Sequence, residues 1–365
     1  MKLFLLTILS LSIPMSLFAD TILPIGKYKS RVIFSKALSK NFAPVVILLP
    51  GSGAHGPQEL IPASMTLTNR DEPLFNKLRY ALNQGGVHTL ALGKPGVEYV
   101  KAGSNTEKFY DKEMFKNLRW EDLLQNLNEA VNYLETREDV DLNSIYLLGH
   151  SEGTKVAVDY ATANPSRIKG LILLGYSAEN LKNTVEWQLI DRQIDYWIKP
   201  DIDINNDGFI TKVEAKDWDE YLNITFPFWK NIINEEEKIP LARFRESLAS
   251  DPSIQKEIKK YEEYLLWSDG VYSGEPYYEK LAKLTQDVWI YTGELDLQTR
   301  ASESLKQKNV CDEYNKSNCY VTIIEGVGHG FSSPRPPRKH PLFDITVGPF
   351  SNDFLKMMTN LALQF

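Results

Sequence analysis

The stretch Ile145-Tyr146-Leu147-Leu148-Gly149-His150-Ser151-Glu152-Gly153-Thr154 carries the strongest structural signal in the chain. Its first four residues are typical of a buried strand, and the residues from Thr154 to Ala163 have a helical pattern. The chain must therefore turn sharply from a strand into a helix between them. A glycine two residues before Ser151 and another two residues after it remove side chains that would clash in such a turn. The pattern predicts a strained turn that exposes the Ser151 hydroxyl.

Apolar runs typical of buried parallel strands alternate with amphipathic helical stretches on both sides of this turn. We expect strands at residues 28–34, 45–49, 87–92, 145–148, 168–174, 288–292 and 320–325. Helices are expected at residues 73–83, 120–134, 154–163, 302–310 and 352–363. This alternation predicts an α/β fold with a mostly parallel sheet flanked by helices.

The alternation stops between residues 178 and 284. This segment is charged and helical in pattern, and it holds five of the seven tryptophans, namely Trp187, Trp197, Trp218, Trp229 and Trp267. We predict one α/β domain, formed by residues 20–177 and 285–365 and interrupted by a mainly helical lid insertion at residues 178–284. The aromatic side chains of the insertion would either line a pocket for an apolar group or pack its own core.

A serine hydroxyl becomes nucleophilic beside a base, and the base needs a carboxylate that orients it. The histidines of the chain are His55, His88, His150, His329 and His340. His329 follows the last expected strand, and Asp296 follows the strand before it. We therefore predict Ser151 as nucleophile, His329 as base and Asp296 as acid. Glu294 and Glu179 remain alternative acids.

These residues, in the order serine, aspartate, histidine, resemble the α/β-hydrolase superfamily over residues 40–177 and 285–365. The resemblance implies an α/β-hydrolase fold and a serine hydrolase without an organic cofactor. It also implies an oxyanion hole made of two backbone N–H groups. One belongs to Glu152, directly after the nucleophile, and the other to Ser52, in the loop after an early strand, with Gly53 as the alternative. This loop has Pro50-Gly51 where many relatives have His-Gly.

The insertion contains Asp203-Ile204-Asn205-Asn206-Asp207-Gly208-Phe209-Ile210-Thr211-Lys212-Val213-Glu214, which resembles an EF-hand calcium loop at every specified position. The resemblance implies a structural calcium ion. Its oxygen ligands would be the side chains of Asp203, Asn205, Asp207 and Glu214, the carbonyl of Phe209 and, through water, Thr211. Helical patterns at residues 185–197 and 213–222 flank the loop. The alternative interpretation is an acidic turn that binds no ion.

The chain of 365 residues has a formal charge of −7, which argues against a nucleic-acid partner because such partners require a basic surface. Residues 1–19 combine Lys2, an apolar run and Ala19, the pattern of a cleavable signal peptide. The alternative is an uncleaved membrane anchor, which the short apolar run and Pro14 disfavour. We therefore expect a secreted or periplasmic protein whose mature chain has no membrane span. Cys311 and Cys319, the only cysteines, are expected to form a disulfide in such a compartment, with two separate thiols as the alternative.

Three functions fit these features. The first is hydrolysis of a small-molecule carboxylic ester through an acyl intermediate on Ser151. The second is a serine peptidase or amidase of the same fold, which would act on short peptides or acylated amines. The third belongs to another class, a calcium-dependent binding protein without catalytic activity. The preference for the ester rests on the family resemblance.

Overall fold

The computed structural model describes residues 21–100, 108–226, 228–268, 270–333 and 348–365. The segment predicted as a signal peptide, residues 1–19, lies outside these ranges, and so does His340. Within them, none of the helices has the length and apolar character that a membrane span requires.

The centre of the fold is an eight-stranded sheet with the order β1-β2-β6-β3-β7-β8-β11-β12. From β6 to β12 all neighbouring strands are parallel, whereas β1 and β2 join the edge in antiparallel pairs. The mostly parallel sheet predicted from the sequence is therefore confirmed. The strands are β1 (Thr21–Ile25), β2 (Ser30–Ser35), β3 (Ala43–Leu49), β6 (His88–Leu92), β7 (Val140–His150), β8 (Gly170–Leu174), β11 (Asp287–Gly293) and β12 (Cys319–Ile324).

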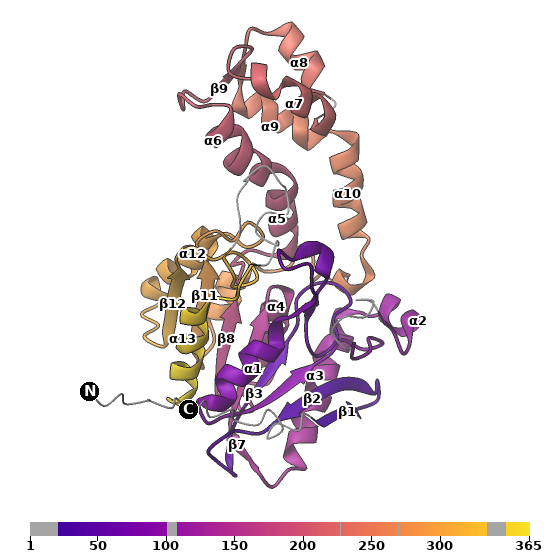
Figure 1. Ribbon diagram of the computed structural model, residues 1–365, viewed down its shortest axis with the longest axis vertical. Helices are drawn as coiled ribbons and strands as arrows, with labels where there is room; N and C mark the ends of the chain where they lie inside the picture. Colours follow the sequence, from indigo (N-terminus) through magenta and orange to yellow (C-terminus); the bar gives the residue numbers. More distant parts are fainter. Residues whose placement is uncertain (1–20, 101–107, 227, 269, 334–347) are drawn as a thin grey trace, which may run out of the picture.

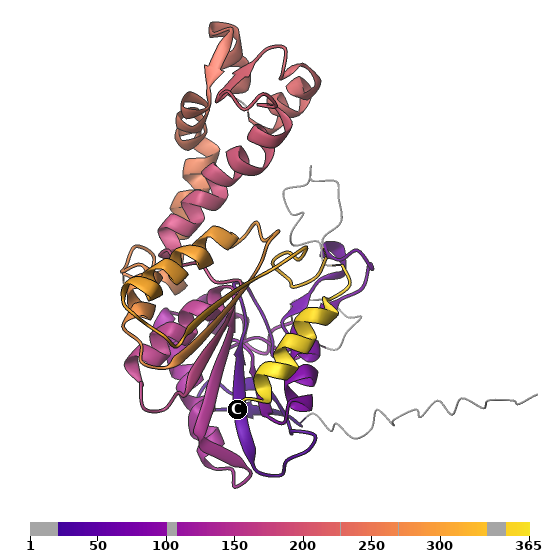
Figure 2. The same ribbon diagram turned by 90° about the vertical axis from the view of Figure 1, so that its left-hand side faces the viewer.

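Helices cover both faces of this sheet (Figure 2). Along β3, Val45, Ile47 and Leu49 pack into one apolar cluster, and Val46 and Leu48 pack into the other, as the two-residue period of a strand requires. The first cluster includes residues of α3 (Trp120–Glu135) and α4 (Glu152–Ala163), and the second includes residues of α1 (Leu74–Gln84) and α13 (Asn352–Ala362). The core elements are completed by β4 (Leu60–Ile61), β5 (Glu72–Pro73), α2 (Lys112–Lys116) and α12 (Ala301–Glu313).

The predicted insertion rises above the carboxyl edge of the sheet and returns to it (Figure 1). Its elements are α5 (Leu181–Glu186), α6 (Lys199–Asp201), β9 (Phe209–Thr211), α7 (Asp219–Thr225), α8 (Trp229–Glu235), β10 (Lys238–Pro240), α9 (Leu241–Ser250), α10 (Pro252–Glu262) and α11 (Tyr277–Ala282). Buried side chains between Ile190 and Ile258 form a separate apolar cluster, which we call the outer core. Residues nearer the ends of the insertion, such as Leu181 and Leu281, pack into the main core.

Of the two helical stretches expected beside the predicted calcium loop, the first is helical throughout with a different helix type, and the second begins later than expected. The helix expected at residues 185–197 is α5 followed by two π-helical turns, at residues 187–191 and 194–198. The helix expected at residues 213–222 begins later, because a turn and a short 3₁₀ segment (Lys216–Trp218) precede α7. A further difference is the antiparallel pairing of β9 with β10, which places Ile210 opposite Ile239.

Candidate active site

Ser151 lies at the carboxyl end of β7, directly before α4, in a left-handed backbone conformation with φ +52°. Its N–H donates to the carbonyl of Leu174 on β8 at 2.9 Å, which fixes the turn to the neighbouring strand. A side chain at Gly149 would overlap with the carbonyl of Gly153, and one at Gly153 would overlap with that of Leu49. The glycine pattern in the sequence is therefore a steric requirement of this turn.

His329 and Asp296 lie together, each in a loop after a strand, as predicted. His329 Nδ1 is 2.9 Å from Asp296 Oδ2. The Asp296 side chain is fully buried and also accepts hydrogen bonds from the N–H groups of Gln298 and Thr299 and from Thr299 Oγ1, each at 2.8 Å. Burial alone would raise the pKa of Asp296, but the charge of His329 and these hydrogen bonds lower it below its usual value.

The two alternative acids are engaged elsewhere. Glu294 Oε2 accepts a hydrogen bond from the N–H of Gly326 at 3.1 Å. Glu179 forms an ion pair with Lys306 and accepts a hydrogen bond from Asn183 at 2.9 Å. Of the three candidate carboxylates, Asp296 is therefore the one placed to orient His329.

The loop after β3 lies beside the Ser151 turn, because a Cβ atom at Gly51 would be 3.1 Å from Cβ of Ser151. The N–H of Gly51 donates to Glu59 Oε1 at 2.7 Å. Glu152 is the first residue of α4, where backbone N–H groups have no partner within their own helix. The oxyanion roles of Ser52 and Glu152 stay predictions.

The side chain of Glu152 is buried in an ion pair that the sequence did not predict. Its Oε1 accepts from Lys94 Nζ at 2.7 Å, and its Oε2 accepts from Trp267 Nε1 at 2.8 Å. Both charged side chains are at most 3% exposed. Trp267 belongs to the returning stretch of the insertion, so this contact joins the insertion to the residue after Ser151.

A second buried carboxylate lies behind the site. Glu59 Oε1, which binds the N–H of Gly51, is also 2.8 Å from Nδ1 of His150. The other ring nitrogen of His150 is 3.0 Å from the carbonyl oxygen of His329. Burial would raise the pKa of Glu59, but the charge and hydrogen bond of His150, the charge of His55 and the Gly51 N–H lower it.

The insertion also contacts the loop that carries Asp296. Gln188 Nε2 donates to the carbonyl of Gln298 at 2.8 Å, and Arg192 Nη1 donates to that of Leu297 at 3.0 Å. The guanidinium of Arg300 lies 4.8 Å from the centre of the Trp187 ring. The rising stretch of the insertion therefore contacts the loop that carries Asp296, and the returning stretch contacts Glu152, the residue after Ser151.

The loop predicted to bind calcium is tightly folded around its own backbone. Asp203 is 1% exposed, and its two oxygens accept from the N–H groups of Asp207 (3.0 Å) and Gly208 (3.1 Å). Asp207 Oδ2 pairs with Lys238 Nζ at 2.8 Å, and this contact lowers the pKa of Asp207. In the part of the chain that the structure describes, no three acidic, histidine or cysteine side chains gather as a ready metal site.

The remaining predicted loop residues lie at the far side of the loop. Asn205 Oδ1 accepts from the N–H of Asp207 at 2.8 Å, and Phe209 and Thr211 belong to β9. Glu214 Oε2 accepts from Thr211 Oγ1 at 2.7 Å, whereas Glu214 Oε1 is a buried atom that has no hydrogen-bond partner among the described residues. Among the described residues the carboxylates of this loop do not converge on one point, so the six calcium ligands stay a prediction.

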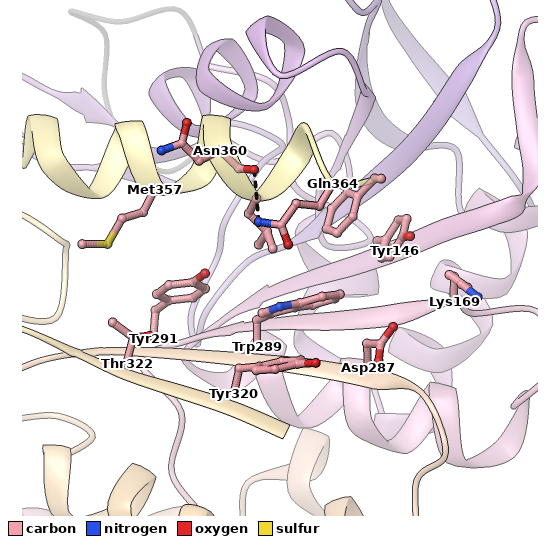
Figure 3. Close-up of a pocket in the computed structure, with 12 residues that line it drawn as sticks. Tyr146, Lys169, Asp287, Trp289, Tyr291, Tyr320, Thr322, Met357, Asn360 and Gln364 are labelled. Carbon is pink, nitrogen blue, oxygen red and sulfur yellow. Dashed lines mark hydrogen bonds between the residues drawn. The ribbon is translucent and has the colours of Figure 1, made fainter. Parts of the chain in front are cut away.

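A separate hollow of about 710 Å³ lies on one face of the sheet, between α13 and strands β7, β11 and β12 (Figure 3). Aromatic rings line it, and Lys169 and Asp287 lie at one end of it. Lys169 precedes β8 and Asp287 begins β11, whereas Ser151 follows the carboxyl end of β7, and none of the three proposed catalytic residues lines the hollow.

Several side chains at the site could not be assigned from the sequence. Thr299, three residues after Asp296, was detectable in principle, because aspartate side chains often accept hydrogen bonds from backbone N–H groups a few residues later in the chain. Glu59, Lys94 and Trp267 come from distant segments and have no local motif.

The predicted disulfide is present, and it joins Cys311 at the end of α12 to Cys319 at the start of β12.

Several solved structures are similar to this chain at low sequence identity. Carboxyl esterase 2 from the fungus Tuber melanosporum is similar at 14% identity with a TM-score of 0.50, over 97% of this chain and 88% of that chain. Est1E from Butyrivibrio proteoclasticus is similar at 15% identity with a TM-score of 0.46, over 95% and 99% of the two chains. A monoacylglycerol lipase from Paleococcus ferrophilus is similar at 13% identity with a TM-score of 0.45, over 92% and 98%.

Structural similarity at such low identity shows the fold alone. None of the curated proteins matches the chain in sequence. The family model described as the alpha/beta hydrolase fold, however, matches residues 44–336, which is well over half of the chain. This protein therefore belongs to the α/β-hydrolase fold family.

Proposed function

We propose that this protein is a serine hydrolase that cleaves a carboxylic ester through an acyl intermediate on Ser151. The observation that carries the proposal is the buried Asp296–His329 pair, which lies at the same edge of the sheet as the Ser151 turn. A buried carboxylate bound to Nδ1 selects the tautomer in which Nε2 can accept a proton from a serine hydroxyl.

In this mechanism His329 accepts the proton of Ser151 as its oxygen attacks the ester carbonyl. The N–H groups of Glu152 and Ser52 stabilise the negative charge on the former carbonyl oxygen. His329 then protonates the departing alcohol, and water, activated by the same histidine, releases the acid. Asp296 keeps its charge throughout, and its lowered pKa supports this role.

Labelling with a fluorophosphonate probe tests the proposal, combined with a panel of chromogenic esters of varied chain length and a panel of aminoacyl anilides. We expect labelling at Ser151 and turnover of esters. Turnover of the anilides alone would favour the peptidase. The absence of labelling and of turnover would favour a binding protein without catalytic activity.

We also propose that the loop at residues 203–214 binds calcium outside the cell, after export directed by residues 1–19. The donor set fits a hard cation, because it consists of oxygens alone, and Glu214 Oε1 is available. Lys238 opposes this fit, since its ammonium already neutralises Asp207. Calorimetric titration of the chelator-stripped protein tests the ion, and N-terminal sequencing of the exported protein tests the cleavage. No heat at millimolar calcium, or an N-terminus at Met1, would overturn the respective part.

A further inference from the structure

Both ring nitrogens of His150 face hydrogen-bond acceptors. Nδ1 is 2.8 Å from Glu59 Oε1, and Nε2 is 3.0 Å from the backbone carbonyl oxygen of His329. A neutral imidazole carries one N–H and can donate from one nitrogen only, whereas an imidazolium donates from both. A backbone carbonyl cannot supply a proton. The ring of His150 is therefore charged wherever Glu59 is a carboxylate.

The surroundings of Glu59 favour the carboxylate. Its Oε1 faces two N–H groups, accepting from Gly51 N–H at 2.7 Å and lying 2.8 Å from Nδ1 of His150, and a carboxylate oxygen is an acceptor only. The other charged or titratable groups near the pair do not supply a competing partner. Lys94 is bound to Glu152 at 2.7 Å, and burial lowers the pKa of His55, which disfavours a positive charge on that ring.

The Glu59–His150 pair joins three segments of the candidate active site. Glu59 holds Gly51 in the loop after β3, His150 is the residue directly before Ser151, and its Nε2 holds the backbone of His329. Glu59 itself has φ +47°, a strained conformation for a residue with a side chain. Strain of this kind is found where the surrounding structure and function require it.

The charge on His150 also acts on the base. The rings of His150 and His329 are 4.8 Å apart between their centres. A positive charge at this distance disfavours a second positive charge, so it opposes protonation of His329 and keeps its Nε2 free to accept a proton. Asp296 acts in the opposite direction on the same ring, so the two neighbours together set the pH range in which His329 is a base.

We propose that Glu59 and His150 form a buried carboxylate–imidazolium pair that positions His329 and keeps it in its basic form. This proposal rests on the proposed function, because it assumes that His329 is the catalytic base. His150 and Glu59 are positioning residues, since they act on the reaction through His329 and the loop at Gly51.

The charge state can be measured without any turnover. In protein labelled with ¹⁵N-histidine, NMR distinguishes an imidazolium from either neutral tautomer, and single variants assign the few histidines. We expect His150 to carry protons on both nitrogens, because both face oxygen acceptors. In Glu59→Gln, which keeps the shape and removes the charge, His150 should become neutral. A neutral His150 in the unaltered protein would overturn the proposal, whether or not the protein hydrolyses esters.

A pair of amide variants separates charge from position. In His150→Gln the amide nitrogen replaces Nε2 and can still donate to the His329 carbonyl, whereas in His150→Asn it replaces Nδ1 and donates to Glu59. Both variants lose the positive charge, so the acidic limb of the kcat/KM profile should move to higher pH by at least about 0.5 unit in each. Only His150→Asn loses the hydrogen bond to the backbone carbonyl of His329. This variant alone should therefore lose about tenfold in kcat at the pH optimum.

His88 provides a matched control. It is fully buried in β6, and its Nδ1 accepts from the N–H of Ala37 at 2.8 Å, away from the candidate site. His88→Gln should lower the melting temperature and leave the acidic limb in place. If both His150 variants fold and keep the acidic limb of the unaltered protein, or if they have equal kcat, the proposal is wrong. If the unaltered protein cleaves no ester, the proposed function fails, and the NMR result still decides the charge of His150.

Discussion

At the scale of single residues, the Ser151 turn contains residues required for the proposed chemistry and residues required for the backbone conformation. The hydroxyl is required for the proposed chemistry, whereas Gly149 and Gly153 are required for the backbone that presents it. We predict that Ser151→Ala abolishes ester turnover and probe labelling, with a melting temperature within about 2 °C of the unaltered protein. Gly153→Ala should destabilise the fold strongly, because the new methyl group overlaps with the carbonyl of Leu49. Residual turnover of Ser151→Ala near the original rate would remove Ser151 as nucleophile.

Asp296 orients His329 through its charge and through a specific oxygen. We predict that Asp296→Asn lowers kcat by about 10⁴-fold, because an amide at this position favours the wrong tautomer of the ring. Glu294→Gln is the matched control, since Glu294 accepts a hydrogen bond from the N–H of Gly326, whereas Asp296 is the carboxylate bound to His329 Nδ1. Steady-state rates of the two variants decide the assignment. Full activity of Asp296→Asn with loss in Glu294→Gln would reverse it.

The buried carboxylate of Asp296 also links stability to pH. Its pKa is lowered in the folded protein, so its contribution to stability is complete above the ordinary aspartate pKa of about 3.9 and is lost as the pH falls through the lowered value. We predict that the free energy of unfolding in urea declines below about pH 4 and that Asp296→Asn declines less steeply there. Equal slopes for the two proteins would mean that Asp296 is not preferentially ionised in the fold.

The three proposed catalytic residues could be predicted from the sequence, because their signals are local. Asp296 and His329 each follow an apolar strand, and Ser151 lies between two glycines with the spacing that its turn requires. The sequence did not reveal Glu59, whose role depends on a contact with His150, 91 residues away. Such residues become visible only when the sheet brings loops together, since nothing in their local sequence differs from an ordinary loop.

At the scale of secondary-structure elements, Trp267 tests how the insertion supports the nucleophile turn. Trp267→Phe keeps an aromatic ring between Tyr261 and Tyr272 but removes the N–H that binds Glu152. We predict a loss of about 2 kcal/mol in stability, typical of a hydrogen bond to a buried charge. We also expect lower kcat, because the N–H of Glu152 is the predicted oxyanion donor.

Trp187→Phe is the control for this change. Trp187 is as buried as Trp267, each being 6% exposed, but its Nε1 has no hydrogen-bond partner within the described residues. The Trp187→Phe variant therefore removes the same ring volume as Trp267→Phe without removing a hydrogen bond of the indole N–H. Denaturant unfolding and initial rates should separate the two variants. Equal effects would show that ring volume, and not the bond to Glu152, explains the result for Trp267.

Elements of the α/β core were predictable because burial imposes a period on them. The run expected at residues 87–92 is β6 (His88–Leu92), and the helix expected at residues 120–134 is α3 (Trp120–Glu135). The elements of the insertion were harder to predict, because its helices are short and pack around a small core. Their apolar residues therefore do not repeat with a helical period over a long stretch. The strand β10 could not be foreseen, since its three residues gain their pairing from β9 alone.

At the scale of the whole molecule, the chain contains a main core around the sheet and the outer core of the insertion. The insertion contacts the main domain beside the candidate active site. Trp267 contacts Glu152, and Gln188 and Arg192 contact the loop of Asp296. An event that orders the insertion can therefore reach both the nucleophile turn and the acid loop. No ligand of the predicted calcium loop belongs to either, so any effect of calcium on turnover must pass through these contacts.

Calcium provides the test of this arrangement. The loop at residues 203–214 contributes Asp203 and Ile210 to the buried interior of the insertion, so an ion bound there should stabilise the outer core and leave the sheet unchanged. At a calcium concentration of 100 Kd, linkage gives about 2.7 kcal/mol of stabilisation. We predict that millimolar calcium slows hydrogen exchange at Trp229 and Phe244, both fully buried in the outer core, and not at Leu147 of β7.

Two variants of the loop give opposite expectations. Glu214→Gln should remove the protection, because it weakens the residue expected to bind through two oxygens. Lys238→Gln should tighten calcium binding, because it frees Asp207 from the ammonium that pairs with it at 2.8 Å. Magnesium should protect less, since it requires a tighter octahedral set of ligands. If calcium changes hydrogen exchange nowhere and the Lys238→Gln variant still binds no calcium, the loop is an acidic turn in which Lys238 of β10 pairs with Asp207. The outer core alone would then stabilise the insertion.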